Sequence, residues 1–301
     1  MDAVTAAFAG LFDYAGLFPP AGLPLEAVCQ RYGSYRAGRH AWMLGRLIVP
    51  AERLDEAESA AAKGGATVEG AWPISVLVGT PEHGAAFVED IAERRRRSWC
   101  LRIEAIEAMA ATELEIQTLA AQWPDGDRFV EVPYDRDPAA LMASLSAHGL
   151  GAKLRAGGIS SDRFPTSAEA ARFLVRAREA NVAVKATAGL HHAVRGDYRL
   201  TYIPDSETGT MHGFVNLVLA AALLMAGRID QDLVDACLDD DRAEAFKISG
   251  RAGSWLNGVV TYGEIAHARQ ALLRSVGSCS FEEPVAEIDA LDFGLKGVDD
   301  A

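Results

Sequence analysis

Two stretches of sequence decide the fold: GAKLRAGG at residues 151–158 and NVAVKATAGLHH at residues 181–192. Each begins with the alternating pattern of a short β-strand and continues into a glycine-containing turn, and residues 167–180 between them predict a helix. A strand, a helix and a second strand in this order predict a βαβ unit with two parallel strands. Each strand of this unit carries one lysine, Lys153 in the first and Lys185 in the second.

The side chains of a strand alternate between its two faces. Lys153 and Arg155 therefore share one face of the first strand, and Lys185 and Thr187 share one face of the second. The opposite faces are apolar, as expected where crossover helices cover a parallel sheet. The pattern thus predicts two lysines that point the same way from neighbouring strands, and the spacing alone leaves either of them as a possible nucleophile.

The rest of the chain repeats this alternation of strands and helices. Further strands are predicted at residues 10–14, 46–50, 73–79, 99–104, 129–134 and 245–249. Further helices are predicted at residues 24–41, 51–63, 109–123 and 138–148, and one more opens at Thr80. About eight βα units result, which is the pattern of a single (β/α)8 TIM barrel that covers residues 1–301.

Two segments interrupt or follow the repeat. Residues 193–241 come after the seventh strand, where barrel enzymes build lids and ligand sites, so we expect an insertion or lid there. Within it, residues 213–227 form an apolar run of 15 residues. A membrane span needs about 20 residues, so this run predicts a buried helix, either in the core or at the interface of a homo-oligomer. Residues 276–301 are expected to form an irregular C-terminal tail.

Composition excludes several classes of partner. The formal net charge is −13 and the sequence pI is about 5.0, which argues against binding to nucleic acid or to an anionic membrane.

The four cysteines lack CxxC spacing, and the N-terminus lacks the basic region of a signal peptide, so we expect a reducing, cytoplasmic location. The nucleotide-binding motifs GxGxxG and GxxxxGK[ST] are absent, and no cofactor is predicted.

Charged residues are expected in the barrel interior. Alternation on the predicted strands sends six of them inward: Arg102, Glu104, Glu131, Lys153, Arg155 and Lys185. Burying a charge costs several kcal/mol unless it is paired or meets a ligand. An ion-paired core is the structural alternative, but the concentration of both signs favours an active site for a small anionic substrate.

At these residues the chain resembles class I aldolases of the deoxyribose-phosphate aldolase type. The resemblance covers residues 151–192 and implies a lyase in which the lysine of the sixth strand, Lys153, forms a Schiff base with a carbonyl substrate. It also implies that the lysine of the seventh strand, Lys185, activates the first and assists proton transfer. An acidic residue on an earlier strand would relay protons. The chain differs from the family at Arg155, where the family has small polar residues.

The residue types fit this chemistry. A second cation and burial can make a lysine nucleophilic at neutral pH. Glu131 or Glu104 could shuttle protons, and Arg155 and Arg102 could bind a carboxylate or phosphate through paired hydrogen bonds. The backbone amides of Gly157-Gly158 could bind anionic oxygens.

Three histidines provide further candidates. His192 is a candidate general acid or base, and His191 and His212 are candidate substrate ligands. Together, or two of them with one of the glutamates, they could instead hold a divalent metal, but no HxH or HExxH spacing supports this and no metal is predicted. Asp13, at the end of the first predicted strand, and Thr187 complete the candidate substrate-binding residues.

The sequence therefore favours a cytoplasmic barrel enzyme that cleaves or forms carbon–carbon bonds in a small anionic carbonyl compound or sugar phosphate. Three alternatives remain. The first is a phosphate-binding barrel transferase, the second is a metal-assisted enzyme, and the third is a noncatalytic barrel that binds an anionic metabolite.

Overall fold

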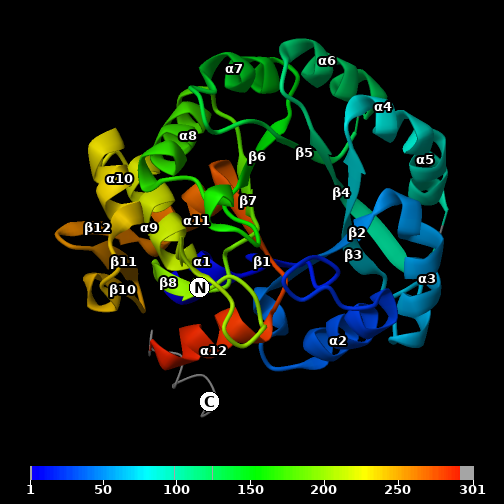
Figure 1. Ribbon diagram of the computed structural model, residues 1–301, viewed down its shortest axis with the longest axis horizontal. Helices are drawn as coiled ribbons and strands as arrows, with labels where there is room; N and C mark the ends of the chain where they lie inside the picture. Colours follow the sequence, from blue (N-terminus) through cyan, green and yellow to red (C-terminus); the bar gives the residue numbers. More distant parts are fainter. Residues whose placement is uncertain (1, 98, 124, 292–301) are drawn as a thin grey trace.

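The computed structural model describes residues 2–97, 99–123 and 125–291. Eight parallel strands close into a barrel in the order β1-β13-β7-β6-β5-β4-β3-β2, and helices surround it (Figure 1). The predicted (β/α)8 barrel is confirmed. The barrel strands are β1 (Phe12–Tyr14), β2 (Leu44–Pro50), β3 (Trp72–Gly79), β4 (Leu101–Met109), β5 (Asp127–Glu131), β6 (Gly151–Arg155), β7 (Val184–Thr187) and β13 (Leu273–Ser278).

The helices that connect β1 to β7 lie close to their predicted positions. They are α2 (Leu25–Ala37), α3 (Leu54–Lys63), α4 (Pro81–Gly84), α5 (Val88–Arg96), α6 (Glu113–Gln122), α7 (Ala139–Ala147) and α8 (Ser167–Glu179). A further helix, α1 (Ala3–Phe8), precedes β1.

Helix α8 illustrates why these segments are helical. The Thr166 hydroxyl accepts a hydrogen bond from the Glu169 backbone N–H, and the Glu169 carboxylate accepts one from the Thr166 backbone N–H, which forms a capping box. Helices α6 and α11 (Tyr262–Ala271) begin with the same arrangement. One face of α8 is apolar at helical spacing and is buried. Its buried residues are Ala170, Ala171, Phe173, Leu174, Val175 and Ala177.

The eighth barrel strand is β13, and the prediction of residues 245–249 for this role is wrong. Phe246–Ser249 does form a strand, β10, but it pairs antiparallel with β11 (Ala252–Trp255). Strand β12 (Gly258–Thr261) completes a separate three-stranded sheet that lies to one side of the barrel (Figure 1). Strand β13 instead pairs with both β7 and β1 and closes the barrel.

The chain between β7 and β13 contains several further elements. Strands β8 (Gly196–Arg199) and β9 (Thr208–Met211) form a two-stranded sheet, and α9 (Phe214–Met225), α10 (Gln231–Asp239), the three-stranded sheet and α11 follow. Helix α9 is buried from Phe214 to Leu224, as predicted for the apolar run at residues 213–227. No helix in the described ranges combines the length and apolar character needed to span a membrane.

The predicted irregular tail at residues 276–301 is wrong for its described part. Strand β13 continues through Ser278, and helix α12 (Glu282–Ala290) follows it. Residues 292–301 lie outside the described residues.

Candidate active site

Two buried lysines and one buried glutamate form the centre of the site. Lys153 on β6 and Lys185 on β7 are paired in register, and their residues are 5% and 1% exposed. Glu107 on β4 lies between their ammonium groups. Its Oε2 is 2.9 Å from Lys153 Nζ, and its Oε1 is 2.6 Å from Lys185 Nζ. The two predicted lysines therefore point the same way and share one carboxylate.

A second buried carboxylate, Asp13 on β1, fixes Lys185 from the other side. Asp13 Oδ2 accepts hydrogen bonds from Lys185 Nζ and, at 2.8 Å, from Ser275 Oγ. Asp13 Oδ1 accepts one from the Arg46 backbone N–H at 2.6 Å. Ser75 donates to Glu107 Oε1 at 2.6 Å. Lys185 is thus held by two carboxylates that are themselves held by other donors.

Lys153 has a second carboxylate partner, Glu131 on β5. Glu131 Oε2 is 3.3 Å from Lys153 Nζ, and Arg155 donates to Glu131 through Nε at 2.6 Å and Nη2 at 3.4 Å. Three carboxylates, those of Asp13, Glu107 and Glu131, therefore face three cations, those of Lys153, Lys185 and Arg155. The balance explains how so many charges are tolerated in the barrel.

Burial and charge act in opposite directions on the pKa values here. Burial alone would raise the pKa of Glu107, but the ammonium groups of Lys153 and Lys185 outweigh it and hold that pKa well below its ordinary value. Burial alone would lower the pKa of Lys185, but the carboxylates of Asp13 and Glu107 raise it. Glu107 and Lys185 are therefore both charged at neutral pH.

A cavity of about 570 Å³ opens at the carboxyl ends of the barrel strands, the end at which barrel enzymes act. Lys153 and Glu107 line it, whereas Lys185 is not among its lining residues. The other lining residues are Ala15, Phe18, Pro19, Ile48, Leu77, Arg155, Gly158, Ile159, Ser160, Arg163, Thr187, Ala188, His191, Gly277 and Cys279. Of the two lysines, Lys153 is the one that a ligand in this cavity would meet.

Most of the residues predicted for the site are brought together. Asp13, Glu131, Lys153, Arg155 and Lys185 form the charged network described above. Thr187, Gly158 and His191 line the cavity. Gly157 instead allows close packing of the chain, because a Cβ there would lie 2.5 Å from Phe164 Cε1 and 2.9 Å from Gly189 Cα.

Arg102 and Glu104 are not brought to this site. They lie at the amino end of β4, where Glu104 pairs with Arg46 at 3.1 Å and with Arg102 at 2.7 Å. A β-bulge in β4 separates them from the part of the strand that reaches the site. Ile74 pairs with Ile103 and Ser75 pairs with Ala105, so the register skips Glu104. A bulge shifts the alternation by one residue, which brings Glu107 to the inner face.

Glu107 is the site residue that sequence reasoning missed. The predicted strand ended at residue 104, whereas β4 continues to Met109. The signal was present in the LRIEAIEAM run, in which Ile103 and Ile106 are both buried and only three positions apart. Such spacing breaks strict alternation and would have indicated a bulge.

His191 is the histidine that reaches the cavity. Its Nδ1 lies 3.0 Å from Ser278 Oγ, and the Cys279 thiol is adjacent. Burial, with a smaller contribution from His192, lowers the pKa of His191 to about 4, so the imidazole is neutral at pH 7. Burial also raises the pKa of the Cys279 thiol to about 11, which keeps it protonated and a poor nucleophile.

His192 and His212 lie elsewhere. His192 Nδ1 is 2.6 Å from Glu287 Oε1, and the ring stacks on Tyr198 beside a smaller cavity of about 290 Å³. His212 donates from Nε2 to the Pro165 carbonyl at 2.8 Å. Within the described ranges, no three His, Cys, Asp or Glu side chains gather so as to hold a metal ion.

No family model, curated protein or solved structure matches the chain.

Proposed function

We propose that the protein is an aldolase-like lyase in which Lys153 forms a Schiff base with a small carbonyl substrate. One observation supports this most strongly: Lys153 lines the cavity and shares the buried Glu107 carboxylate with Lys185. Class I aldolases of the deoxyribose-phosphate aldolase type, which the sequence resembles, use two lysines on the same consecutive strands. Arg155 and Arg163 line the cavity as well, and they favour a substrate that carries a negative charge.

In this proposal Glu131 moves the protons. Its carboxylate reaches Lys153 Nζ at 3.3 Å and is less deeply buried than that of Glu107, with side chains 14% and 1% exposed. In the proposed reaction Lys153 gives one proton to Glu131, and its neutral amine attacks the carbonyl carbon to form a carbinolamine. Glu131 then returns the proton to the carbinolamine hydroxyl, which leaves as water, and an iminium ion remains on Lys153.

Glu107 has a different part in this scheme. Its low pKa keeps it ionised, so its Oε2 stays a negative charge beside the iminium nitrogen on Lys153. A fixed negative charge next to a developing positive charge stabilises the iminium ion. Lys185 and Ser75 hold the carboxylate in place from its Oε1 side, and both are positioning residues here.

Borohydride trapping tests the proposal. The protein is incubated with sodium borohydride together with one carbonyl compound at a time: acetaldehyde, acetone, pyruvate or dihydroxyacetone phosphate. Its intact mass is then measured. We expect at least one compound to add its own mass less one oxygen atom, because the imine loses water and gains two hydrogen atoms on reduction. Lys153→Arg keeps the positive charge but has no primary amine, and it should lose the adduct.

Lys63→Arg is the matched control, since Lys63 is exposed and pairs only with Glu26 in the described chain. It should be trapped as well as the original protein. An adduct that persists in a folded Lys153→Arg variant would exclude Lys153 as the nucleophile.

A further inference from the structure

A cavity of about 220 Å³ lies at the amino ends of the barrel strands, opposite to the cavity that Lys153 lines. Its walls come from the starts of three strands, with Asp127 in β5, Gly151 in β6 and Arg274 in β13, and from Ala183, which directly precedes β7. These four strands are neighbours in the barrel. We call this space the amino-end cavity.

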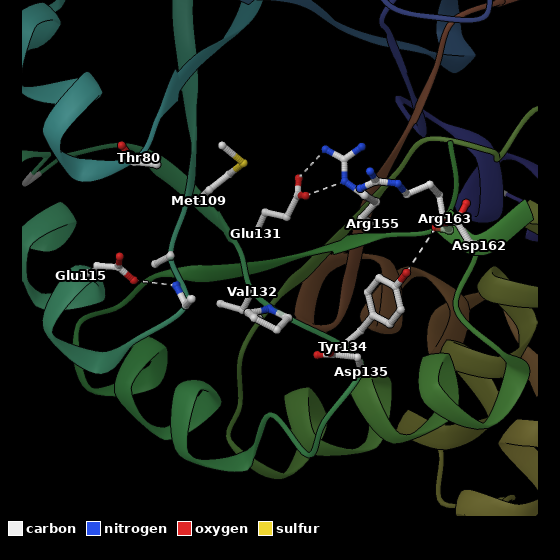
Figure 2. A pocket seen from close by; sticks show the side chains of 13 residues that line it. Thr80, Met109, Glu115, Glu131, Val132, Tyr134, Asp135, Arg155, Asp162 and Arg163 are labelled. Atoms are coloured by element: carbon white, nitrogen blue, oxygen red, sulfur yellow. Dashed lines mark hydrogen bonds and ion pairs between the residues drawn. The ribbon is translucent and has the colours of Figure 1, made fainter. Parts of the chain in front are cut away.

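Phe129 lies between the amino-end cavity and the charged network. It lines the cavity, and its buried ring packs against Gly151, where a Cβ would lie 2.6 Å from Phe129 Cδ1. Two residues further along β5, Glu131 faces Arg155 in a cavity at the carboxyl end (Figure 2). The amino-end cavity shares no lining residue with the cavity of Lys153, so a group bound there meets a different set of side chains.

The lining of the amino-end cavity carries more positive than negative charge. Two guanidiniums line it, those of Arg128 and Arg274, and one carboxylate, that of Asp127. The carboxylate is already engaged, because Asp127 Oδ2 lies 2.7 Å from Arg46 Nη2. An excess of guanidinium groups at one place is notable in a protein whose formal net charge is −13.

The charges around Asp127 balance without the two lining arginines. Arg46 pairs with both Asp127 and Glu104, and Glu104 pairs in turn with Arg102. Two cations therefore face two carboxylates in this group. Asp127 has no further charge to offer to Arg128 or Arg274.

Arg128 is held in place by neutral groups. Its Nη1 donates to the Trp123 carbonyl at 2.5 Å, and its Nη2 donates to the carbonyls of His148 at 3.5 Å and Gly149 at 3.3 Å. These carbonyls lie at the carboxyl ends of α6 and α7, so Arg128 offsets the partial negative charge that helices carry there. The contacts fix its guanidinium at the cavity wall and keep the helix ends from repelling an anion.

Arg274 is the cation that nothing offsets. It is exposed, and within the described ranges its side chain has no ion pair or hydrogen bond. Arg269 lies beside it and donates from Nη1 to the Arg274 carbonyl. Burial lowers the pKa of Arg269 to about 10, the Asp13 carboxylate opposes this shift, and the Arg274 guanidinium adds to it. Arg274 therefore has a like charge as its neighbour, which a bound anion would offset.

Two neutral polar side chains complete the lining, those of Asn181 and Ser146. Helices α7 and α8 end in the same way, with Gly149 at a φ of +63° and Asn181 at a φ of +55°. In each turn the next N–H donates to a carbonyl five positions back, at 2.9 Å after Gly149 and 2.8 Å after Asn181. Glycine is the residue best suited to this conformation. Asparagine tolerates it too and brings an amide donor to the cavity.

We propose that the amino-end cavity binds a phosphate group between Arg128 and Arg274, with the Asn181 amide and the Ser146 hydroxyl as further donors. A phosphate group offers at least three acceptor oxygens to these four donor groups, whereas a carboxylate offers two. Guanidinium groups suit such an oxyanion. This inference is independent of the proposed function, because it involves no residue of the lysine site.

The size of the cavity limits what it can enclose. Sites for drug-sized ligands have volumes of about 300–1,000 Å³, and the amino-end cavity has about 220 Å³. It therefore encloses the phosphate group and leaves any attached organic part in solvent. Free inorganic phosphate and a phosphate monoester both carry this group.

Isothermal titration calorimetry of the full chain at low ionic strength tests the inference with three probes: inorganic phosphate, glycerol 3-phosphate and glycerate. We expect the phosphate compounds to bind and glycerate to bind more weakly or not at all. Tighter binding of inorganic phosphate would identify the free ion as the ligand, and tighter binding of glycerol 3-phosphate would identify a monoester. The proposal is overturned if neither phosphate compound binds at millimolar concentration, or if glycerate binds as tightly.

Two variants place the bound phosphate. Arg274→Gln removes a side chain without a partner in the described chain, so the fold should be kept, and the affinity should fall about tenfold or more. Asn181→Asp keeps the size of the side chain and suits the left-handed backbone, but its negative charge should weaken binding at least as much. If Asn181→Asp does not fold, Asn181→Gly replaces it, because Gly149 occupies the same position in the other turn.

Two further variants are controls. Arg251→Gln removes an exposed arginine that lines neither this cavity nor that of Lys153. Arg163→Gln removes an arginine of the cavity of Lys153. Both should bind phosphate like the original protein. The proposal is overturned if Arg274→Gln or the Asn181 variant leaves the affinity unchanged, and a loss of binding in Arg163→Gln alone would place the phosphate at the lysine site instead.

Discussion

Glu107 is the residue on which the charged network most depends. It is 2% exposed and is the partner that the two buried ammonium groups share. Removing one partner of a buried ion pair leaves an uncompensated charge, which costs far more than the pair itself contributes. The two lysines would then face each other with only Asp13 and Glu131 to offset them.

The Glu107→Gln variant is expected to lower the free energy of unfolding by about 3–5 kcal/mol, measured by denaturation in guanidinium chloride. Glu104→Gln is the matched control on the same strand. Glu104 also contacts two cations, but its side chain is 31% exposed, so its loss should cost no more than about 1 kcal/mol. Equal losses of unfolding free energy in the two variants would contradict the conclusion that the charged network depends most on Glu107.

His191 makes stability depend on pH in a defined window. Its pKa is lowered by burial to about 4 in the folded protein, against about 6.5 in an unfolded chain. The unfolded state therefore binds a proton between pH 6.5 and pH 4 while the folded state does not. Stability falls as the pH drops through this window, by up to about 3 kcal/mol, and the loss is complete below pH 4.

The His191→Gln variant removes this titration. Unfolding free energies measured at pH 7, 6, 5 and 4 should fall less steeply for the variant than for the original protein. Parallel curves over this range would show that His191 is not a buried neutral imidazole.

The identity of the site residues was predictable where the strand alternation is regular. Lys153, Arg155 and Lys185 were predicted from alternation alone, and all three lie in the network. Glu107 was not predicted, because one skipped residue in β4 reverses the alternation beyond it. Asp13 was a candidate only because of its position at the end of a predicted strand. Its partners Lys185 and Ser275 were not predictable, because they lie 172 and 262 positions away in the sequence.

At the scale of elements, the loops that follow β6 and β7 pack directly on each other. Gly157 and Gly189 come within contact distance through their backbones, with Phe164 against both. Gly189 has a φ of +67°, and Ala188, which lines the cavity, has a φ of +65° although it is not a glycine. The turn after β7 is therefore held in a left-handed conformation beside the site.

Gly157→Ala is expected to lower the free energy of unfolding by about 1–3 kcal/mol, as for other overpacked sites, because its Cβ would overlap Phe164. Gly263→Ala in α11 is the control, since the nearest atom to its Cβ is 4.0 Å away. The control should be neutral or stabilise the protein by up to about 1 kcal/mol. A Gly157→Ala variant as stable as the control would contradict the close contact of the two loops.

Element prediction failed at the last barrel strand for a related reason. Buried and exposed residues alternate along Phe246–Ser249. Its sequence therefore predicts a strand as strongly as the sequence of β13 does. Strand β13 carries Ser275, Gly277 and Ser278, small residues that suit a crowded barrel interior but have weak strand propensity. Which strand closes the barrel depends on long-range pairing that local patterns do not record.

At the scale of the whole molecule, the alternation of strands and helices was sufficient to predict the barrel. That prediction needed neither exact boundaries nor the last strand, because consecutive parallel βα units favour few architectures. The cavities at the two ends of the barrel could not be predicted, since they depend on how the loops fold over the strand ends. The charge balance of the site likewise became visible only with all eight strands in place.

The location of the reduced adduct tests the central claim most directly. The chain has five lysines, Lys63, Lys153, Lys185, Lys247 and Lys296. After borohydride trapping with the best compound of the panel, proteolytic digestion and tandem mass spectrometry identify the modified lysine. We predict modification of Lys153, although exposed lysines such as Lys63 and Lys247 are more accessible to solvent. Modification of Lys185 instead, or labelling confined to the exposed lysines, would contradict it.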